Sequence, residues 1–208
     1  MQTKNVLLLT PPMTREMLLA AALGYLLGSI PFGLVLTLLA GKGDVRKIGS
    51  GNIGATNVLR TGSKGLAALT LILDCLKATA AVLVAQRLFG PEAGPAAGAG
   101  ALIGHMYPVW LGFRGGKGAA TLLGLLIPLL PIAAGVYAAV WILVLLTSRI
   151  SSVAGMSAAV SAPVTAAVLH SSLLPMLLGC AVLILWKHRE NILRLKAGKE
   201  PRIGRAKA

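Results

Sequence analysis

Seven long apolar runs, separated by polar and basic connections, constrain this chain more than any other feature of its sequence. The runs cover residues 17–40, 65–88, 96–111, 119–130, 132–147, 153–169 and 172–186. Of the 208 residues, 56% are hydrophobic and only 12% are charged. This is more apolar surface than a soluble core of such size could bury. We therefore expect an all-α integral membrane protein, a bundle of about seven transmembrane helices that forms one domain over residues 1–208.

The ends of the chain differ from the apolar runs. Residues 1–15 form a mixed N-terminal segment, and residues 187–208 form a basic tail. The run at 17–40 is far longer than the core of a signal peptide, so we expect it to remain as the first transmembrane helix. The sequence Gly-Ser-Ile-Pro-Phe-Gly at 28–33 interrupts this run and predicts a proline kink or a local unwinding.

The basic residues are distributed unevenly between the two sides that seven spans would create. Sixteen of the 20 Lys and Arg residues lie in the segments 42–64, 112–117, 149 and 187–208. The positive-inside rule assigns this side to the cytoplasm and the N-terminus to the outside. The second, fourth and sixth spans then begin on the cytoplasmic side, so three positive helix ends are expected to converge there.

The net charge of +14 could also suggest nucleic-acid binding. A nucleic-acid binder gathers its basic residues on a soluble face, whereas here they lie between apolar runs. We therefore interpret them as topology signals and anion ligands, and we expect no nucleic-acid partner.

A basic, glycine-dense turn around Lys117 separates two apolar runs. Gly115, Gly116 and Gly118 leave the backbone amides uncovered, and the run at 119–130 predicts a helix. Backbone amides at a helix N-terminus bind anions. The P-loop pattern is a poor match, because its first Gly and its Ser or Thr are both absent. Two interpretations stay open on these grounds: a phosphate site, or an interfacial turn that needs glycine for packing and lysine for topology.

The connection at residues 41–64 contains a misleading pattern. The segment 49–54 fits G-x-G-x-x-G, and Asp74 follows about twenty residues later. A dinucleotide site also needs a preceding strand and a βαβ unit, and neither is predicted here. This pattern therefore does not indicate a Rossmann fold.

Polar side chains without an acid follow in the same connection. The candidate substrate-binding residues are Ser50, Gly51, Asn52, Thr56, Asn57 and Arg60. We predict a glycine turn entering a short helix, on which Asn52, Thr56 and Arg60 recur at i, i+4 and i+8 and share one face. Hydroxyl, amide and guanidinium groups in this arrangement fit a phosphate-binding surface better than a solvated loop.

Asp74, Lys77 and His105 lie well inside apolar runs, away from their ends. Asp74 and Lys77 are three residues apart near the middle of a predicted span, where an unpaired charge is costly, so we expect them to pair. A structural role is favoured over a catalytic one. His105 is interpreted as a neutral, hydrogen-bonded core residue, with contact to a substrate as the alternative.

The last polar groups flank the sixth and seventh spans. Ser151 and Ser152 either cap the sixth span or supply hydroxyls to an anion at its N-terminus. His188 and Asn191 are three residues apart at the start of the tail and share a helical face. The alternative for this tail is a positive-inside anchor.

These motifs together resemble the bacterial acyl-phosphate:glycerol-3-phosphate acyltransferases, the PlsY family. The resemblance extends from about residue 28 to residue 202. It is carried by Gly-Ser-x-Pro-x-Gly at 28–33, Ser-Gly-Asn-x-Gly-Ala-Thr-Asn-x-x-Arg at 50–60, His105, Pro108, Phe113, Gly-Gly-Lys-Gly at 115–118 and His-x-x-Asn-Ile-x-Arg-Leu at 188–195.

The resemblance implies transfer of a fatty acyl group from acyl phosphate to the 1-hydroxyl of sn-glycerol 3-phosphate, giving lysophosphatidic acid and phosphate. It implies acyl phosphate, glycerol 3-phosphate and membrane lipid as partners, and a cytoplasmic active site in a bacterial inner membrane. No activated nucleophile is evident, so we expect direct attack, with Lys117 and Arg60 stabilising phosphate charge. His188 or a substrate phosphate would remove the proton.

Neither a metal nor a cofactor is expected, because the acids near the basic motifs lie in different settings. The rival function is a small membrane transporter of a phosphate-containing anion. Transporters usually place the polar site near the midplane between inverted repeats, whereas these motifs lie at one face and no repeat is evident.

Overall fold

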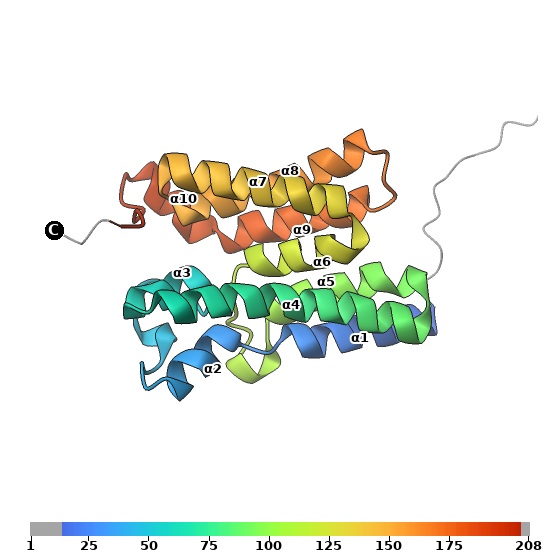
Figure 1. Ribbon diagram of the computed structural model, residues 1–208, viewed down its shortest axis with the longest axis horizontal. Helices are drawn as coiled ribbons and strands as arrows, with labels where there is room; N and C mark the ends of the chain where they lie inside the picture. The colour runs from blue at the N-terminus through green and yellow to red at the C-terminus, as the bar shows by residue number, and fades with distance from the viewer. Residues whose placement is uncertain (1–13, 205–208) are drawn as a thin grey trace, which may run out of the picture.

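A computed structural model describes residues 14–204, which form helices and loops without any strand (Figure 1). The helices are α1 Arg15–Gly28, α2 Phe32–Leu39, α3 Ala55–Val58, α4 Lys64–Phe89, α5 Gly94–Met106, α6 Ala119–Leu129, α7 Pro131–Ser148, α8 Ser151–Val168, α9 Leu174–Lys187 and α10 Arg189–Lys196. Short 3₁₀ turns are η1 Val45–Lys47, η2 Leu59–Thr61, η3 Pro91–Ala93 and η4 Val109–Leu111. Each of the seven predicted runs contains a helix, which confirms the all-helical prediction. Most of the predicted N-terminal segment and the end of the basic tail lie outside the described residues.

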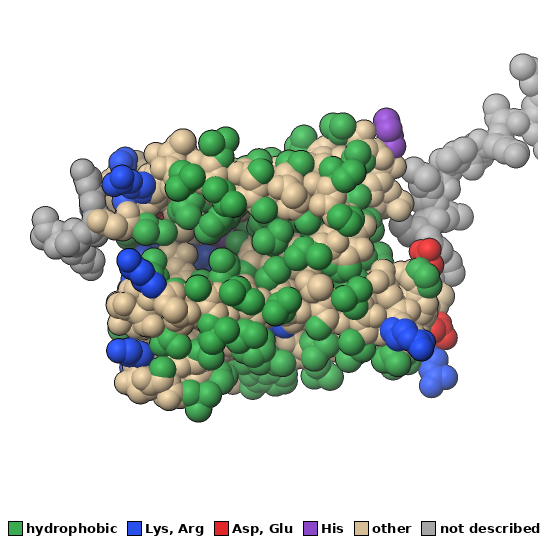
Figure 2. Space-filling view, in the orientation of Figure 1, with side chains coloured by type: hydrophobic (Ala, Val, Ile, Leu, Met, Phe, Trp, Pro, Cys, Tyr) green, Lys and Arg blue, Asp and Glu red, His purple; other side chains and the backbone are tan. Residues whose placement is uncertain are grey.

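Several helices are suited to a membrane. Four stretches of the described chain are long and apolar enough to cross a bilayer: Arg15–Leu39 across α1 and α2, and the helices α4, α7 and α8. The helices α6 and α9 are apolar but shorter. Hydrophobic side chains cover the flank of the bundle, while Lys and Arg gather at its two ends (Figure 2).

The helices form two halves with α6 between them (Figure 1). In one half, α1 packs against α5 and α4; in the other, α8 packs against α7 and α9. Helix α6 contacts α4 on one side and α7 on the other, and its Leu122, Leu125 and Leu126 are fully buried. The Tyr137 hydroxyl of α7 donates a hydrogen bond of 2.9 Å to the Ala119 carbonyl and holds the first turn of α6 in place.

Small residues allow α1 and α5 to approach closely. Gly24 and Gly28 of α1 lie against the backbone of α5, and Gly100 and Gly104 of α5 lie against the backbone of α1. A Cβ atom at Gly100 would overlap the carbonyl oxygen of Ala21. Close backbone contact of this kind drives helix association inside membranes, where lipid tails are as apolar as leucine.

The first apolar run is broken between α1 and α2, as its Gly-Ser-Ile-Pro sequence predicts. Two side chains from distant segments satisfy the carbonyl groups freed by the break. The Trp110 indole donates to the Ser29 carbonyl at 2.9 Å, and Lys77 Nζ donates to the Ile30 carbonyl at 2.8 Å. Such unwinding is stable in a membrane bundle when neighbouring groups restore the lost hydrogen bonds.

Two predicted helix boundaries are wrong. The third run was expected to continue to residue 111, but α5 ends at Met106, because Pro108 removes a backbone donor and restricts the residue before it. The helix predicted to carry Asn52 begins only at Ala55. Asn52 instead forms a turn in which its Oδ1 accepts a hydrogen bond of 2.9 Å from the Gly54 amide.

Of the helix N-caps predicted from the sequence, one is confirmed and one is wrong. The Ser63 hydroxyl accepts the Leu66 amide at 3.3 Å and caps α4, as its position before the second run suggests. Neither Ser151 nor Ser152 caps α8, because both are already helical and Ile150 occupies the cap position. The Ser148 hydroxyl accepts the Ile150 amide at 3.0 Å instead.

The tight α1–α5 contact predicts a position-specific loss of stability. Gly100→Val should destabilise the protein by about 1–3 kcal/mol or more, because the side chain must push two backbones apart. Gly135→Val on α7 is the matched control, since a Cβ there meets nothing within 4 Å. Thermal unfolding of both variants in the same detergent measures the difference. Equal stability of the two variants would contradict the proposed role of the close contact.

Candidate active site

A cavity of about 650 Å³ opens near the end of the bundle that carries α3 and α10. Its walls come from the loop at 48–60, from α4, from the turn before α6, from the start of α8 and from the tail after α9. Figure 2 shows basic and histidine side chains at the bottom of a hollow between the two halves. The cavity therefore joins segments from both halves of the molecule.

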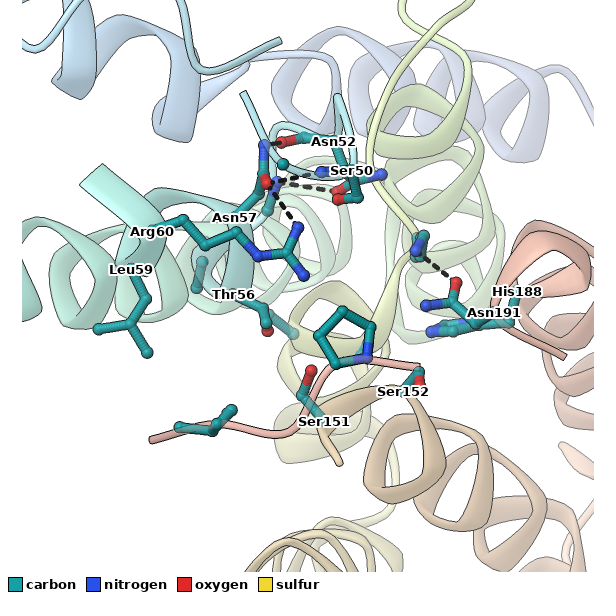
Figure 3. Close-up of a pocket in the computed structure, with 18 of the residues that line it drawn as sticks. Ser50, Asn52, Thr56, Asn57, Leu59, Arg60, Ser151, Ser152, His188 and Asn191 are labelled. Atoms are coloured by element: carbon teal, nitrogen blue, oxygen red, sulfur yellow. Dashed lines mark hydrogen bonds between the residues drawn. The ribbon is translucent and has the colours of Figure 1, made fainter. Parts of the chain in front are cut away.

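Most of the predicted site residues line this cavity (Figure 3). They are Ser50, Asn52, Thr56, Asn57, Arg60, Lys117, Gly118, Ser151, Ser152, His188 and Asn191, together with the further candidates Asp74 and His105. Four predicted residues are not among the lining residues: Gly51, Gly115, Gly116 and Lys77. The structure thus brings together side chains that are separated by more than a hundred positions.

Asn57 organises the loop at 48–60. Its Nδ2 donates to three loop carbonyls at 2.8–3.1 Å, and its Oδ1 accepts the Ser50 amide at 3.1 Å and Arg60 Nη1 at 3.0 Å. Because both ends of this buried amide are occupied, Asn57 shapes the loop and leaves no free group for a substrate. It also directs the Arg60 guanidinium along the cavity wall (Figure 3).

At Gly115 and Gly116 the glycine turn fits the second of its two interpretations, close packing. The Gly115 amide donates to the Met106 carbonyl at 3.1 Å, and the Gly116 amide donates to the His105 carbonyl at 2.9 Å. The expectation that both amides are free for an anion is therefore wrong. Gly118 adopts a positive φ of 87° at the start of α6, a conformation that favours glycine.

Two positive helix ends reach the cavity. The first residues of α6 and of α8 line it, and helix geometry leaves their leading N–H groups without intrahelical partners. The predicted convergence of a third helix end is wrong. The cavity meets α4 at Leu71 and Asp74, well inside that helix, and not at its beginning.

Lys117 extends from the glycine turn to the opposite half of the molecule. Its Nζ donates a hydrogen bond of 2.5 Å to Asn191 Oδ1 (Figure 3). Burial, reinforced by the positive charge of Arg194, lowers the pKa of Lys117 to about 8, although Glu200 opposes this shift. The ammonium is still mostly charged at pH 7, and it gains from an additional anion nearby.

Glu200 is the functional group that the sequence analysis missed. Its carboxylate accepts hydrogen bonds from Ser152 Oγ at 2.7 Å, from Arg194 Nε at 2.7 Å and from Asn191 Nδ2. Burial alone would raise the pKa of Glu200, but these hydrogen bonds outweigh it and lower the pKa. The sequence feature that could have pointed to Glu200 is the presence of an acidic residue in a strongly basic tail.

His188 presents a neutral imidazole to the cavity. Its Nδ1 lies 2.8 Å from the Ile184 carbonyl, which can only accept, so the proton is assigned to Nδ1 and Nε2 keeps its lone pair. Burial lowers the pKa of His188 to about 4. Nε2 can therefore accept a proton or a hydrogen bond at neutral pH.

Comparison with known proteins decides the family. A family model described as glycerol-3-phosphate acyltransferase matches residues 18–198. The chain belongs to the glycerol-3-phosphate acyltransferase family. A protein named glycerol-3-phosphate acyltransferase from Agrobacterium fabrum is 56% identical over 89% of this chain and 91% of its own length. One of the same name from Mesorhizobium japonicum is 55% identical over 92% of this chain and 98% of its own length.

Two solved structures share the fold. A crystal structure of PlsY, described as an integral membrane glycerol 3-phosphate acyltransferase in its glycerol 3-phosphate form, is 41% identical with a TM-score of 0.85, over 90% of this chain and 96% of that one. A second, in the lysophosphatidic acid form, is 40% identical with a TM-score of 0.82, over 90% and 95%. The predicted resemblance to the PlsY family and the membrane assignment are confirmed.

The protonation of His188 predicts how stability depends on pH. An unfolded histidine binds a proton below its usual pKa of 6.5, whereas folded His188 binds one only near pH 4. Stability should therefore fall as the pH decreases from 6.5 to 4, by about 3 kcal/mol from this group. Thermal unfolding of His188→Gln should show a shallower decline, whereas the exposed His170→Gln should follow the parent protein. Parallel pH curves for His188→Gln and the parent would contradict the assignment.

Proposed function

We propose that the protein transfers a fatty acyl group from acyl phosphate to the 1-hydroxyl of sn-glycerol 3-phosphate, giving lysophosphatidic acid and inorganic phosphate for phospholipid biosynthesis. Family membership supports the acyltransferase class. The observation that carries the proposal is a single cavity in which cationic groups and helix N-termini stand beside an apolar wall. Both substrates of this reaction contain phosphate, and one also carries an alkyl chain.

The cationic part of the cavity suits phosphate. Arg60 and Ser151 line the cavity from the two halves of the molecule (Figure 3). Lys117 lines it from the turn before α6. Hydrogen bonds between charged groups and phosphate are stronger than neutral ones, and the helix N-termini add partial positive charge. These groups would hold the phosphates of donor and acceptor.

The apolar wall suits the fatty acyl chain. Leu71 of α4, Trp141 of α7 and the alanines at 119 and 120 line the cavity. The hollow between the two halves reaches the hydrophobic flank of the bundle (Figure 2). An acyl chain could therefore lie between α4 and α7 while its phosphate stays among the cations.

The chemistry would be a direct transfer. The 1-hydroxyl oxygen attacks the acyl carbon, a new C–O ester bond forms, the C–O bond to phosphate breaks, and phosphate leaves with the bonding electrons. Lys117 and Arg60 would stabilise the charge on the leaving phosphate. The hydroxyl proton would pass to His188 Nε2 or to a substrate phosphate. A covalent intermediate is not required, because the acceptor hydroxyl itself can attack the acyl carbon, and the two cysteines do not line the cavity.

The distribution of basic residues supports a topology for this site. Seven spans, with the N-terminus outside, would place the cavity and the C-terminus in the cytoplasm of a bacterial inner membrane. Glycerol 3-phosphate would then reach the site from the cytoplasm, and acyl phosphate would reach it from the inner leaflet.

The identity of the donor is tested by comparing two activated acyl groups. Purified protein in lipid vesicles, with glycerol 3-phosphate and acyl phosphate, should form lysophosphatidic acid and release one phosphate per ester. Acyl coenzyme A in place of acyl phosphate should give no product above background. Efficient turnover with acyl coenzyme A alone would show that the proposed donor is wrong. Failure to form the ester with either donor would contradict the proposed function.

Replacing Lys117 should distinguish its proposed role as a phosphate ligand from a role as a topology signal only. Lys117→Arg keeps the charge, but the planar guanidinium cannot take the place of a compact ammonium that fits between two glycines and Asn191. Activity should fall roughly tenfold to a hundredfold, as expected for about 1.5–3 kcal/mol from a charged hydrogen bond. Lys117→Ala should lose at least as much activity.

The control for this pair is Lys196→Ala, which removes an exposed cation from α10 and should change activity little. All variants are compared at equal membrane expression, so that a folding defect is not counted as lost catalysis. Full activity in both Lys117 variants would exclude Lys117 from phosphate binding.

A further inference from the structure

Three ionisable side chains lie buried together between α4 and α5, and two of them, Asp74 and His105, also belong to the cavity lining. Lys77 Nζ is 2.7 Å from Asp74 Oδ1 and 3.0 Å from His105 Nδ1. Each side chain exposes only 3–4% of its surface. Ionisable groups inside a membrane bundle are costly and occur mainly where they pair and serve a function. The predicted pairing of Asp74 with Lys77 is confirmed, and His105 is an additional member of the cluster.

The hydrogen bonds of Lys77 determine how His105 is held. The ammonium has three donors and no acceptor, and its third partner is the Ile30 carbonyl at the break between α1 and α2. His105 Nδ1 must therefore accept from Lys77, which assigns the imidazole proton to Nε2. Asp74 Oδ1 binds the same ammonium at 2.7 Å; it lies 3.6 Å from Nδ1, and no proton lies between these two atoms. The orientation of the ring is thus set by Lys77 of α4, which Asp74 and the Ile30 carbonyl hold in place.

The opposite edge of the same ring supports the glycine turn. The Gly116 amide donates to the His105 carbonyl at 2.9 Å, so the turn is tied to the end of α5. A Cβ atom at Gly116 would overlap the imidazole, and the three heavy atoms nearest to it would all belong to this ring. Lys117 is the next residue. The position of its backbone therefore depends on where the His105 ring lies.

We propose that His105, held by Lys77, is a positioning residue that sets the place of Lys117 in the cavity through direct contact with Gly116. It acts through the turn and requires no contact with the reacting atoms. The inference deepens the proposed function and rests on it where acyl transfer is measured. The contact also accounts for the glycine at position 116, whose amide is not free for an anion.

A double-variant experiment on His105 and Gly116 tests this contact. Gly116→Ala alone should push the turn away from the ring and lower kcat/KM on the order of a hundredfold, the usual effect of a displacement of ~1 Å in an active site. His105→Ala alone should lower it as well, because the turn loses its support. In the double variant the new methyl group occupies the vacated space, so activity should be no lower than in His105→Ala alone.

A second measurement reports on Lys117 without any acyl transfer. The rate at which Lys117 reacts with an amine-modifying reagent, followed by mass spectrometry across pH 7–11, gives its pKa in each variant. The parent should titrate near 8. Gly116→Ala should move this value towards 10.5, because the displaced ammonium regains solvent, and the double variant should move it back.

Thr79→Val provides the matched control. Thr79 also lies on α4, and its hydroxyl donates to the Gly124 carbonyl at 2.7 Å and to the Cys75 carbonyl at 3.4 Å, which belong to neither the cluster nor the turn. This variant should lose thermal stability while the reactivity of Lys117 stays unchanged. A merely structural role of His105 predicts the same result for His105→Ala.

The proposal would be overturned if the losses of kcat/KM in the two single variants multiplied in the double variant. It would also be overturned if Lys117 had the same pKa in Gly116→Ala as in the parent. The proposal is supported if the double variant is no less active than His105→Ala, and if the pKa of Lys117 rises in Gly116→Ala and falls back in the double variant. If the parent protein forms no lysophosphatidic acid but Lys117 titration still shows the coupling, the proposed function fails while the positioning role stands.

Discussion

Irregular backbone inside a lipid-embedded bundle must find hydrogen-bond partners within the protein, and the whole site depends on this constraint. The break between α1 and α2, the loop at 48–60 and the turn before α6 all leave regular helix. Groups from elsewhere in the chain complete two of them: Trp110 and Lys77 at the break, and the carbonyls at the end of α5 at the turn. The loop is completed by its own Asn57 amide. Non-helical segments can therefore surround a cavity without exposing unpaired groups to lipid.

The balance of charge follows from the same constraint. Lys117 is largely buried, and its lowered pKa expresses the cost of keeping an ammonium away from water. Glu200 reduces this cost only indirectly, because Asn191 stands between the two groups. A phosphate beside Lys117 would be a direct partner and would return its pKa towards the usual value. A cation that the fold leaves incompletely compensated would therefore favour binding of a phosphate beside it.

Sequence patterns predicted what depends on local chemistry and missed what depends on folding. The helices followed from the apolar runs, and most cavity residues followed from polar groups that are rare in so hydrophobic a chain. The role of Glu200 was not predictable, because it requires the tail to fold back, as the Ile203 amide does when it donates to the Arg149 carbonyl at 2.7 Å. The amides of Gly115 and Gly116 were misassigned for a similar reason. Glycine permits both anion binding and close packing, and only the position of α5 distinguishes them.

The position of α6 explains how one cavity can serve a charged head and an apolar chain. Because α6 lies between α4 and α7, it keeps these two helices apart and leaves a hollow that reaches the hydrophobic flank (Figure 2). Its first turn, held by Tyr137, carries Lys117 just before the helix and the small Ala119 just inside it. The lining therefore changes from cationic to apolar within one helical turn, about 5 Å. The ester or anhydride carbon of an acyl substrate, which lies between its charged and alkyl parts, would come to rest at this boundary, within reach of both the phosphate ligands and His188.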